Sequence, residues 1–282
     1  MEKLIYNIAD LSICMEMPFH LKVSRESEPF LESAEAHCAA GVKVVAVDAL
    51  PPMKAGGIWY EDRYFWGESV HIRSGPQKEP YAVVEYGENA QVRIAYLRGS
   101  ENRISESGHL LKMLGLEKLL LCHRALILHA SFVRWQGNGI LFSAPSGTGK
   151  STQASLWARY MGAEVLNGDR AGIRYADGAW RAYGLPYAGT SGIFRNCSAP
   201  IRAIVVLRQS AENRIRPAGT AEALQALLPE FSAHRWSAGF MNSVLDLTAQ
   251  LLGEIPVYCL ECRPDQDSVQ LLHDTLFGGD IL

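Results

Sequence analysis

A chain of 282 residues is long enough for one large domain or two smaller ones, and it can bury roughly 75% of its unfolded surface. Its composition, 48% hydrophobic and 20% charged, is ordinary for a globular protein in water. A formal net charge of −3, with no basic block interleaved with aromatic residues, argues against nucleic acid as a partner. The N-terminus lacks a basic-then-apolar targeting pattern, and the most apolar window, residues 119–130, is interrupted by His123 and Arg124. We therefore expect a cytoplasmic protein with no membrane partner.

The cysteines are scattered through a chain too large to need disulfide staples, so disulfide bonds are not expected. Two of them form a C-x-x-C motif, which invites a zinc interpretation. That motif overlaps a strand-like apolar run at 257–260, where a spacing of three places the two side chains on opposite faces. We expect buried free thiols there rather than a metal site. The six positions are Cys14, Cys38, Cys122, Cys197, Cys259 and Cys262.

The first part of the chain, residues 1–105, is predicted to be a β-rich accessory domain. Its clearest signal is a hairpin, in which the alternating runs 81–86 and 91–97 flank a short polar turn. No nucleotide or metal motif occurs there, and recognition of an acceptor is one role that this domain could serve. Residues 106–122 carry leucines at helical spacing, so we expect a helix linking this domain to residues 123–282.

The most informative stretch is residues 144–151, which read Ala-Pro-Ser-Gly-Thr-Gly-Lys-Ser. They follow an apolar run at 140–142 and precede a predicted helix at 152–161. A strand, a glycine-rich turn, Gly-Lys-Ser and a helix form the arrangement that binds nucleotide phosphates. The pattern G-x-x-x-x-G-K-[ST] has glycine at its first position, where this chain has Ala144. Alanine is the smallest replacement, so we expect the turn to form.

Each residue type in this stretch has a chemical task. Gly147 and Gly149 let the backbone turn with its N–H groups facing an anion. Lys150 supplies a positive charge for the β- and γ-phosphates, Ser151 offers a hydroxyl to Mg²⁺, and the positive end of the helix dipole lies beneath the phosphates. The predicted nucleotide-binding residues are Ser146, Gly147, Thr148, Gly149, Lys150, Ser151 and Thr152.

A hairpin is expected to bring a histidine to this turn. Residues 126–135 and 139–143 are predicted strands around a two-residue turn, Gly137-Asn138. With that turn the paired residue numbers sum to 275, which places His129 beside Ser146, within an uncertainty of one residue. An antiparallel strand next to the phosphate-binding turn is unusual for common P-loop proteins, whose central strands are mainly parallel.

An acidic residue follows the next apolar run. After a strand at 163–166 comes Asn167-Gly168-Asp169-Arg170, and an acid at this place can hold Mg²⁺ or orient a nucleophile. The alternative is that Asp169 only caps a turn. Arg170 could position Asp169 or the substrate, or form a surface salt bridge.

The remaining segments are predicted more simply. Residues 173–175 and 180–182 form a hairpin with an Asp-Gly turn. The polar, glycine-rich segment 184–196 is either a connector or a loop that closes over an anion, where Arg195 could clamp phosphate oxygens. Strands are expected at 203–207 and 257–260, and helices at 221–228, 244–252 and 268–277.

Together, Leu128-His129-Ala130, the hairpin, the stretch 146–151 and the turn 167–170 resemble the C-terminal domain of HPr kinase/phosphorylase. The similarity is greater to the diverged HPr-kinase-like proteins of bacterial peptide-modification systems, and it covers roughly residues 125–277. The resemblance implies an α/β protein whose P-loop lies in a mixed sheet of the phosphoenolpyruvate-carboxykinase type, with a smaller β-rich N-terminal domain. It also implies transfer of a γ-phosphoryl group to a serine hydroxyl.

The resemblance assigns roles to four residues and shows two departures. Lys150 and Ser151 carry over to phosphate and Mg²⁺ binding, His129 to the histidine near the transferred phosphate, and Asp169 to the second of two adjacent acids. The family's first acid aligns with Gly168, and its acid after the Lys-Ser pair aligns with Thr152. Two arrangements stay open. Asp169 could be the base with Ser151 alone on the metal, or Asp169 could hold Mg²⁺ and leave proton transfer to His129.

We therefore predict an HPr-kinase-like serine kinase that uses ATP, or another nucleoside triphosphate, and Mg²⁺. The expected catalytic residues are Asp169, His129 and Lys150, and the expected metal ligands are Ser151 and Asp169. The acceptor is a peptide or protein serine. The alternatives are a non-catalytic nucleotide-gated binding module, which Gly168 favours, and a kinase of a small hydroxylated metabolite such as free serine. The sequence leaves open the acceptor's identity, the choice among ATP, GTP and pyrophosphate, and the oligomeric state, a homo-oligomer included.

Overall fold

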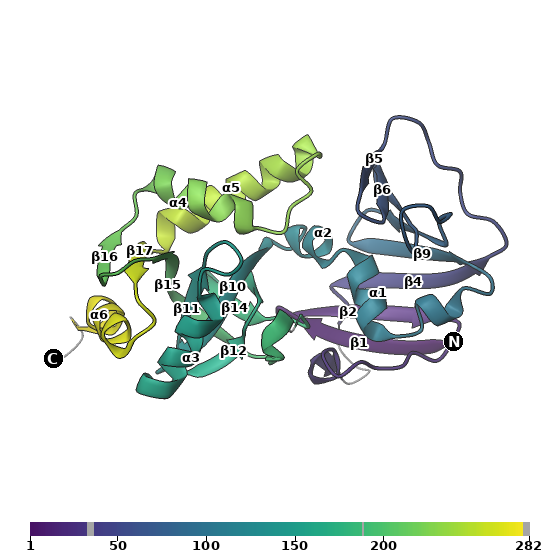
Figure 1. The fold of residues 1–282 in the computed structure, drawn as a ribbon. Coiled ribbons are helices and arrows are strands. Elements are labelled where there is room, and N and C mark those ends of the chain that lie inside the picture. The colour runs from purple at the N-terminus through teal and green to yellow at the C-terminus, as the bar shows by residue number, and fades with distance from the viewer. Residues whose placement is uncertain (33–36, 188, 279–282) are drawn as a thin grey trace. The chain divides into compact units, whose positions relative to one another are not determined.

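The structure is a computed structural model that describes residues 1–32, 37–187 and 189–278. The chain divides into two compact units, Met1–Cys122 and His123–Leu282, and each is described by itself. Both are built around mixed β-sheets with helices, so the protein has an α/β fold (Figure 1).

The first unit contains one sheet of nine strands within its described residues, in the order β3-β1-β2-β4-β9-β8-β7-β6-β5. Strand β2 shows why the sheet forms: every second residue is buried, as expected for a strand with one face on the core. The predicted hairpin is confirmed, since β8 and β9 pair in antiparallel register. The strands are β1 (Glu2–Ile8), β2 (Leu11–Met17), β3 (Leu31–Glu32), β4 (Ala40–Val47), β5 (Ile58–Tyr60), β6 (Arg63–Trp66), β7 (Ser69–Ile72), β8 (Ala82–Tyr86) and β9 (Gln91–Leu97).

The expected helix at 106–122 is interrupted. It forms two short helices, α1 (Ser107–Leu114) and α2 (Leu116–Leu121), because Gly115 between them has a left-handed backbone with φ of 62°. Tyr86 of β8 donates its hydroxyl to the carbonyl of Leu114, which fixes the end of α1 against the sheet. Two 3₁₀ turns, η1 (Glu28–Phe30) and η2 (Glu101–Arg103), complete this unit's helical segments in the part described.

A disulfide joins Cys14 and Cys38, contrary to the expectation that the chain needs none. Cys14 lies on β2 and Cys38 lies just before β4, and these two strands pair in parallel. That pairing brings their Cα atoms to 5.6 Å, within the range for a disulfide. Cys259 and Cys262 are free thiols, as expected, with Cys259 buried and Cys262 half-buried.

In the second unit, strand pairings close a ring in the order β11-β10-β13-β14-β15-β11. Strand β10 makes this possible because its first half pairs with β13 and its second half pairs with β11 and β12. Strand β15 continues to β17 in parallel, and β17 pairs with β16. The strands are β10 (Ala125–Trp135), β11 (Asn138–Ser143), β12 (Glu164–Asn167), β13 (Arg170–Ala176), β14 (Ala179–Gly184), β15 (Ser198–Gln209), β16 (Arg214–Pro217) and β17 (Val257–Cys262).

The predicted turn of the first hairpin is wrong by one residue. Gln136 and Gly137 have positive φ, 46° and 77°, and form the turn, so paired residue numbers sum to 273 rather than 275. Asn138 instead begins β11 opposite Trp135 and donates its side-chain amide to the carbonyl of Gln136. The Asp177-Gly178 turn of the second hairpin, between β13 and β14, is confirmed by positive φ at both residues.

Helices α3 and α6 bury their apolar sides with β11, β15 and β17 in one core. Trp157 of α3 is fully buried there and lies 6.3 Å, ring to ring, from Trp135 of β10. Helices α4 and α5 pack on each other and lie apart from α3 in Figure 1. The helices are α3 (Lys150–Met161), α4 (Thr220–Leu227), α5 (Ala238–Glu254) and α6 (Gln266–Phe277), with 3₁₀ turns η3 (Gly189–Ser191) and η4 (Leu228–Glu230).

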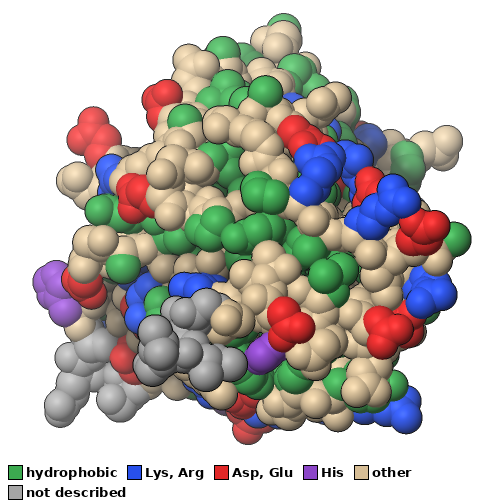
Figure 2. Space-filling model, turned by 90° about the vertical axis from the view of Figure 1, so that its left-hand side faces the viewer, with side chains coloured by type: hydrophobic (Ala, Val, Ile, Leu, Met, Phe, Trp, Pro, Cys, Tyr) green, Lys and Arg blue, Asp and Glu red, His purple; other side chains and the backbone are tan. Residues whose placement is uncertain are grey.

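The face drawn in Figure 2 carries acidic and basic side chains interspersed with apolar ones, and neither sign dominates it. None of the helices in the described residues combines the length and the apolar character that crossing a lipid bilayer requires.

Candidate active site

The turn between β11 and α3, residues 144–149, is called the glycine loop below. Gly147 and Gly149 have φ of 81° and 116°, which L side chains rarely adopt, so glycine is required at both positions. Ala144 is buried in the core below α3 and has no positive φ, so the departure from glycine at this position costs no strain. Ser146 and Gly147 are exposed, and α3 begins directly after Gly149 with its first N–H groups unpaired by any side-chain cap.

Lys150 is buried at the base of the glycine loop. Its Nζ donates to the carbonyls of Ala144, at 2.6 Å, and Pro145, at 3.3 Å. Burial lowers the pKa of Lys150, and the negative charges of Glu230 and Asp169 act against that shift. These two carboxylates therefore lie within electrostatic reach of the loop's lysine.

A tight turn between β12 and β13 presents Asp169. The buried side chain of Asn167 holds this turn, because its Oδ1 accepts from the backbone N–H groups of both Asp169 and Arg170, at 2.9 and 3.0 Å. The Asn167 amide also donates to the carbonyls of Leu185 and Tyr187, which ties the segment after β14 to the same turn.

The carbonyl of Gly168 connects this turn to α3 and to β10. It accepts from Ser151 Oγ at 3.3 Å and from the buried Ser131 Oγ at 3.1 Å. Ser151, the predicted Mg²⁺ ligand, thus donates to the residue that directly precedes Asp169. Thr152, on the first turn of α3, is exposed.

His129 lies beside Asp169, with Nε2 3.5 Å from Oδ1. His129 lies near the start of the glycine loop, but in another register than expected. Ala130, the residue after it, pairs with Ser143, the last residue before the loop. Ser143 itself donates to the His129 carbonyl at 3.1 Å. The predicted pairing of His129 with Ser146 is therefore wrong, because the turn begins one residue earlier.

Glu230 is the residue that sequence reasoning missed. Its Oε2 is 2.9 Å from His129 Nδ1, and its side chain is only 11% exposed. Glu230 ends η4, and the next residue, Phe231, forms a bridge with Leu128 of β10. It is 101 residues from His129, and no local motif marks it.

The turn between β12 and β13, residues 167–170, is called the acidic turn below, and the segment after β14 packs directly on it. A Cβ placed on Gly168 would lie 2.1 Å from Ser191 Oγ, and one on Gly189 would lie 2.7 Å from Asp169 Cγ. The space beside Gly168 is therefore filled by Ser191. Of the expected segment 184–196, residue 188 lies outside the described residues.

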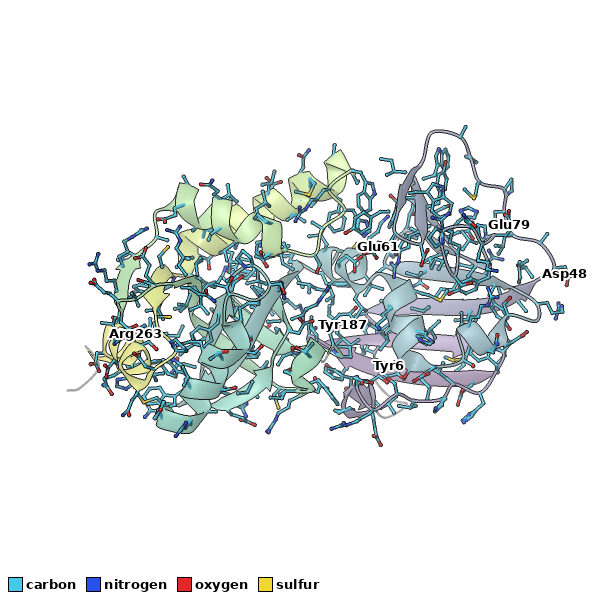
Figure 3. All side chains as sticks on the ribbon, viewed as in Figure 1. Tyr6, Asp48, Glu61, Glu79, Tyr187 and Arg263 are labelled. Carbon is cyan, nitrogen blue, oxygen red and sulfur yellow. A yellow bond between two sulfur atoms is a disulfide. The ribbon has the colours of Figure 1, made fainter. Side chains whose placement is uncertain are left out.

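Neither nearby arginine is aimed at the glycine loop by its contacts. Arg195 and Arg134 both pair with Glu164, each at 2.5 Å. In this structure Arg195 therefore binds a carboxylate of β12 and is not placed to clamp an anion at the glycine loop. Arg170 lies 3.5 Å from Asp169 Oδ2 and over the ring of Tyr187, which Figure 3 labels.

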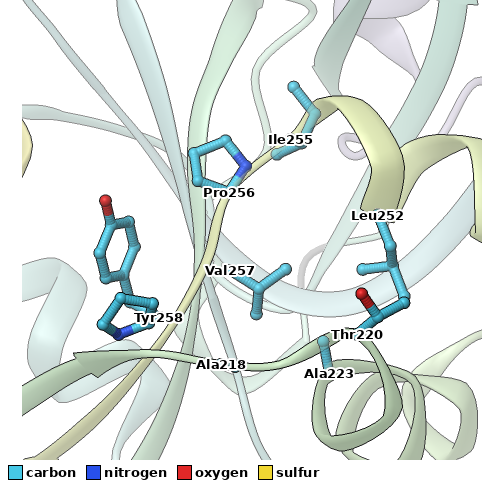
Figure 4. A pocket seen from close by; sticks show the side chains of 9 residues that line it. Ala218, Thr220, Ala223, Leu252, Ile255, Pro256, Val257 and Tyr258 are labelled. Carbon is cyan, nitrogen blue, oxygen red and sulfur yellow. The ribbon is translucent and has the colours of Figure 1, made fainter.

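Two hollows in this unit lie elsewhere. They have volumes of about 150 and about 440 Å³ and share Ile255, Pro256 and Tyr258, which Figure 4 labels. Neither is lined by a predicted site residue, so they do not mark the candidate site. Within the described residues, no three His, Cys, Asp or Glu side chains form a group suited to hold a metal ion.

Comparison with known proteins places this arrangement in a family. The family described as "SynChlorMet cassette protein ScmC" matches residues 114–263, which is just over half of the chain and includes the glycine loop and the acidic turn. No curated protein matches the chain. Among solved structures, the Hpr(Ser) kinase/phosphatase from Coxiella burnetii is similar at 12% identity and a TM-score of 0.29, over 55% of this chain and 89% of that chain.

Proposed function

This chain belongs to the SynChlorMet cassette protein ScmC family, and we propose that it is a phosphotransferase. It binds ATP, or another nucleoside triphosphate, with Mg²⁺ and transfers the γ-phosphoryl group to a serine hydroxyl of a peptide or protein. The observation that supports this most is the convergence of a phosphate-binding motif and an acid–histidine pair. The negative charge of Asp169 acts on the pKa of Lys150, against the lowering by burial, and Asp169 lies 3.5 Å from His129.

The residues present fit a nucleotide. Two glycines with left-handed backbones, free helix N–H groups and a lysine are what a polyphosphate needs. In this proposal the Lys150 ammonium, which now bonds to loop carbonyls, turns to phosphate oxygens.

The oxygen donors fit Mg²⁺ as well. Ser151 and Asp169 would hold it, and two protein oxygens suffice because this ion usually keeps several waters and takes phosphate oxygens. When bound, Mg²⁺ neutralises the charge of the phosphate oxygens. A set of three or more ligating side chains, which a protein-only cage would need, is not required here.

Proton removal falls to the pair His129 and Asp169. As the acceptor oxygen bonds to the γ-phosphorus, the bond to the nucleoside diphosphate breaks and the acceptor's proton leaves. Two assignments of the base are compatible with the contact between His129 and Asp169. Asp169 could take the proton itself, or it could hold Mg²⁺ while the neighbouring His129 takes the proton. Phosphoryl transfer depends mainly on positioning and charge, which the glycine loop supplies.

A non-catalytic, nucleotide-gated module is the second candidate, and one observation favours it. Gly168 carries no acid, and Ser191 fills the space that a side chain would need. With a single carboxylate in the turn, a phosphate could be bound without being transferred.

The test is transfer of label from γ-labelled ATP, with Mg²⁺, to serine-containing peptides encoded near this gene and to free serine. We expect Lys150→Ala to abolish nucleotide binding, and Asp169→Asn to lower transfer about 10²- to 10⁴-fold while the fold is kept. Binding is measured by calorimetry and transfer by mass spectrometry of the acceptor.

Lys43→Ala, at an exposed lysine of β4, and Asp246→Asn, at an exposed aspartate of α5, are the matched controls and should behave as the unaltered chain. Unchanged ATP affinity in Lys150→Ala would refute the nucleotide site. Binding without transfer to any acceptor would favour the second candidate, and label on free serine would replace the peptide acceptor by a metabolite.

A further inference from the structure

His129 has a carboxylate on each side of its ring. One belongs to Asp169 in the turn after β12, and the other belongs to Glu230 at the end of η4. Nε2 faces Asp169 Oδ1 at 3.5 Å, and Nδ1 contacts Glu230 Oε2 at 2.9 Å. The second distance is that of a hydrogen bond to a charged partner, whereas the first is at the outer limit for one. The ring is therefore held through Nδ1.

The backbone places Glu230 opposite His129. Phe231 bridges Leu128 in antiparallel fashion, and the N–H of Ser232 donates to the carbonyl of Ile127 at 2.9 Å. Extending this register by one residue pairs Glu230 with His129. Paired residues of adjacent antiparallel segments have side chains on the same face, so the contact is set by the fold and not by a flexible side chain alone.

Burial makes this carboxylate expensive unless it has a partner. The Glu230 side chain is 11% exposed, and a buried charge is retained when hydrogen bonds and nearby charges compensate it. Its partners are the His129 ring and, at longer range, the Lys150 ammonium, on whose pKa Glu230 acts more strongly than Asp169 does. Glu230 thus contacts His129 and acts electrostatically on Lys150, two of the predicted catalytic residues.

An ionised carboxylate only accepts hydrogen bonds, so a hydrogen bond from His129 to Glu230 requires the proton on Nδ1. In the neutral ring that choice leaves the lone pair on Nε2, which is the nitrogen that faces Asp169. We propose that Glu230 is the positioning residue of the site: it fixes the orientation and the tautomer of His129 so that Nε2 is presented to Asp169 and the acceptor. This inference rests on the proposed function, and it adds a residue that neither the glycine loop nor the acidic turn contains.

The kinetic test uses the full chain. We expect Glu230→Ala to lower kcat by at least about 10-fold, with KM for ATP changed less than about twofold, because the nucleotide contacts stay intact. Glu230→Gln keeps an oxygen that can accept from Nδ1 and should recover part of the loss. In a His129→Gln background, Glu230→Ala should have no further effect, since its partner is already gone.

Glu222→Gln is the matched control. Glu222 is also a paired carboxylate, but it contacts Arg216 and Arg208 and lies on α4, upstream of η4. Its kcat should equal that of the unaltered chain. A kcat unchanged by Glu230→Ala, or a full further loss in the His129→Gln background, would overturn the inference.

A second measurement does not need turnover. Long-range ¹H–¹⁵N spectra of chain labelled with ¹⁵N-histidine distinguish a proton on Nδ1 from one on Nε2, and His129→Gln identifies the signal. We expect the Nδ1–H form in the unaltered chain and in Glu230→Gln, and loss of that form in Glu230→Ala. An unchanged His129 pattern in Glu230→Ala overturns the positioning role. Absence of phosphoryl transfer with the expected spectra refutes the proposed function instead.

Discussion

At residue scale, position 168 decides what chemistry the acidic turn has available. Gly168 has no positive φ, so its backbone does not demand glycine. The demand comes from Ser191, whose Oγ and Cβ would lie 2.1 and 2.5 Å from an added Cβ. The packing of Ser191 against Gly168 therefore leaves no room for a second acidic side chain in this turn.

Gly168→Asp should destabilise the protein because Ser191 must be displaced. Overpacking of this kind costs about 1–3 kcal/mol, which corresponds to a fall in Tm of roughly 2–12 °C for a chain of this size class. Adding Ser191→Gly removes both clashing atoms and should restore most of the Tm. The Ser191→Ala background is the control, since its Cβ remains and should give little rescue. Thermal unfolding measures all four chains, and a Gly168→Asp chain as stable as the unaltered one would contradict the packing account.

Local sequence was sufficient for part of this site and insufficient for the rest. Lys150 and Asp169 follow from motifs of a few residues, because the glycine loop and the turn after β12 are formed by neighbours in the chain. His129 required the register of a hairpin, and an error of one residue in the turn moved its predicted partner. Glu230 depends on a bridge between segments about 100 residues apart, which no periodicity encodes. Their roles in catalysis remain predictions.

At the scale of elements, strands and helices with strong patterns were predictable and their extents were not. The strand expected at 203–207 is the buried centre of β15, which runs on at both ends to pair with two different neighbours. The linking helix at 106–122 breaks at Gly115, where a leucine pattern alone could not show the left-handed backbone. Tertiary pairing and a single glycine explain these two differences.

One element pairing has a pH dependence that can be measured. Hydrogen bonding to Arg216 lowers the pKa of Glu222 to about 2 from its usual 4.5, and so couples α4 to β16. A lowered pKa contributes stability that is complete above the unfolded value and is lost as the pH falls from about 4.5 towards 2. Glu222→Gln should therefore be less stable than the unaltered chain at pH 7, and this difference should shrink below pH 4.5.

Urea unfolding at several pH values measures that difference, and Glu212→Gln is the control. Glu212 pairs with Arg214, but both side chains are about two-thirds exposed or more, so little effect is expected at any pH. A difference between the Glu222→Gln and unaltered chains that stayed constant down to pH 2 would rule out the ion pair as its cause.

At the scale of the whole molecule, the interactions that stabilise the interior of each unit differ between the two units. The second unit's core is closed by a ring of strand pairings and by buried aromatics such as Trp157. In the first unit a buried group of hydroxyls, Ser24, Ser27 and Ser107, joins α1 to the segment after β2. Tyr6, labelled in Figure 3, lies close to it, and burial raises the pKa of its hydroxyl. A covalent link, Cys14–Cys38, is added to this polar contact.

Reduction of that disulfide should destabilise the first unit selectively. The bond closes a loop with a sequence separation of 24, for which chain-entropy arguments give about 3 kcal/mol. Hydrogen exchange followed by mass spectrometry should show faster exchange in β1, β2 and β4 after reduction, while β10, β11 and β15 exchange as before. Cys14→Ser should reproduce the effect without reductant, and reductant should then add nothing. Equal acceleration in both units would mean that the disulfide supports the entire chain, and no acceleration would mean that the parallel pairing of β2 with β4 is stable without it.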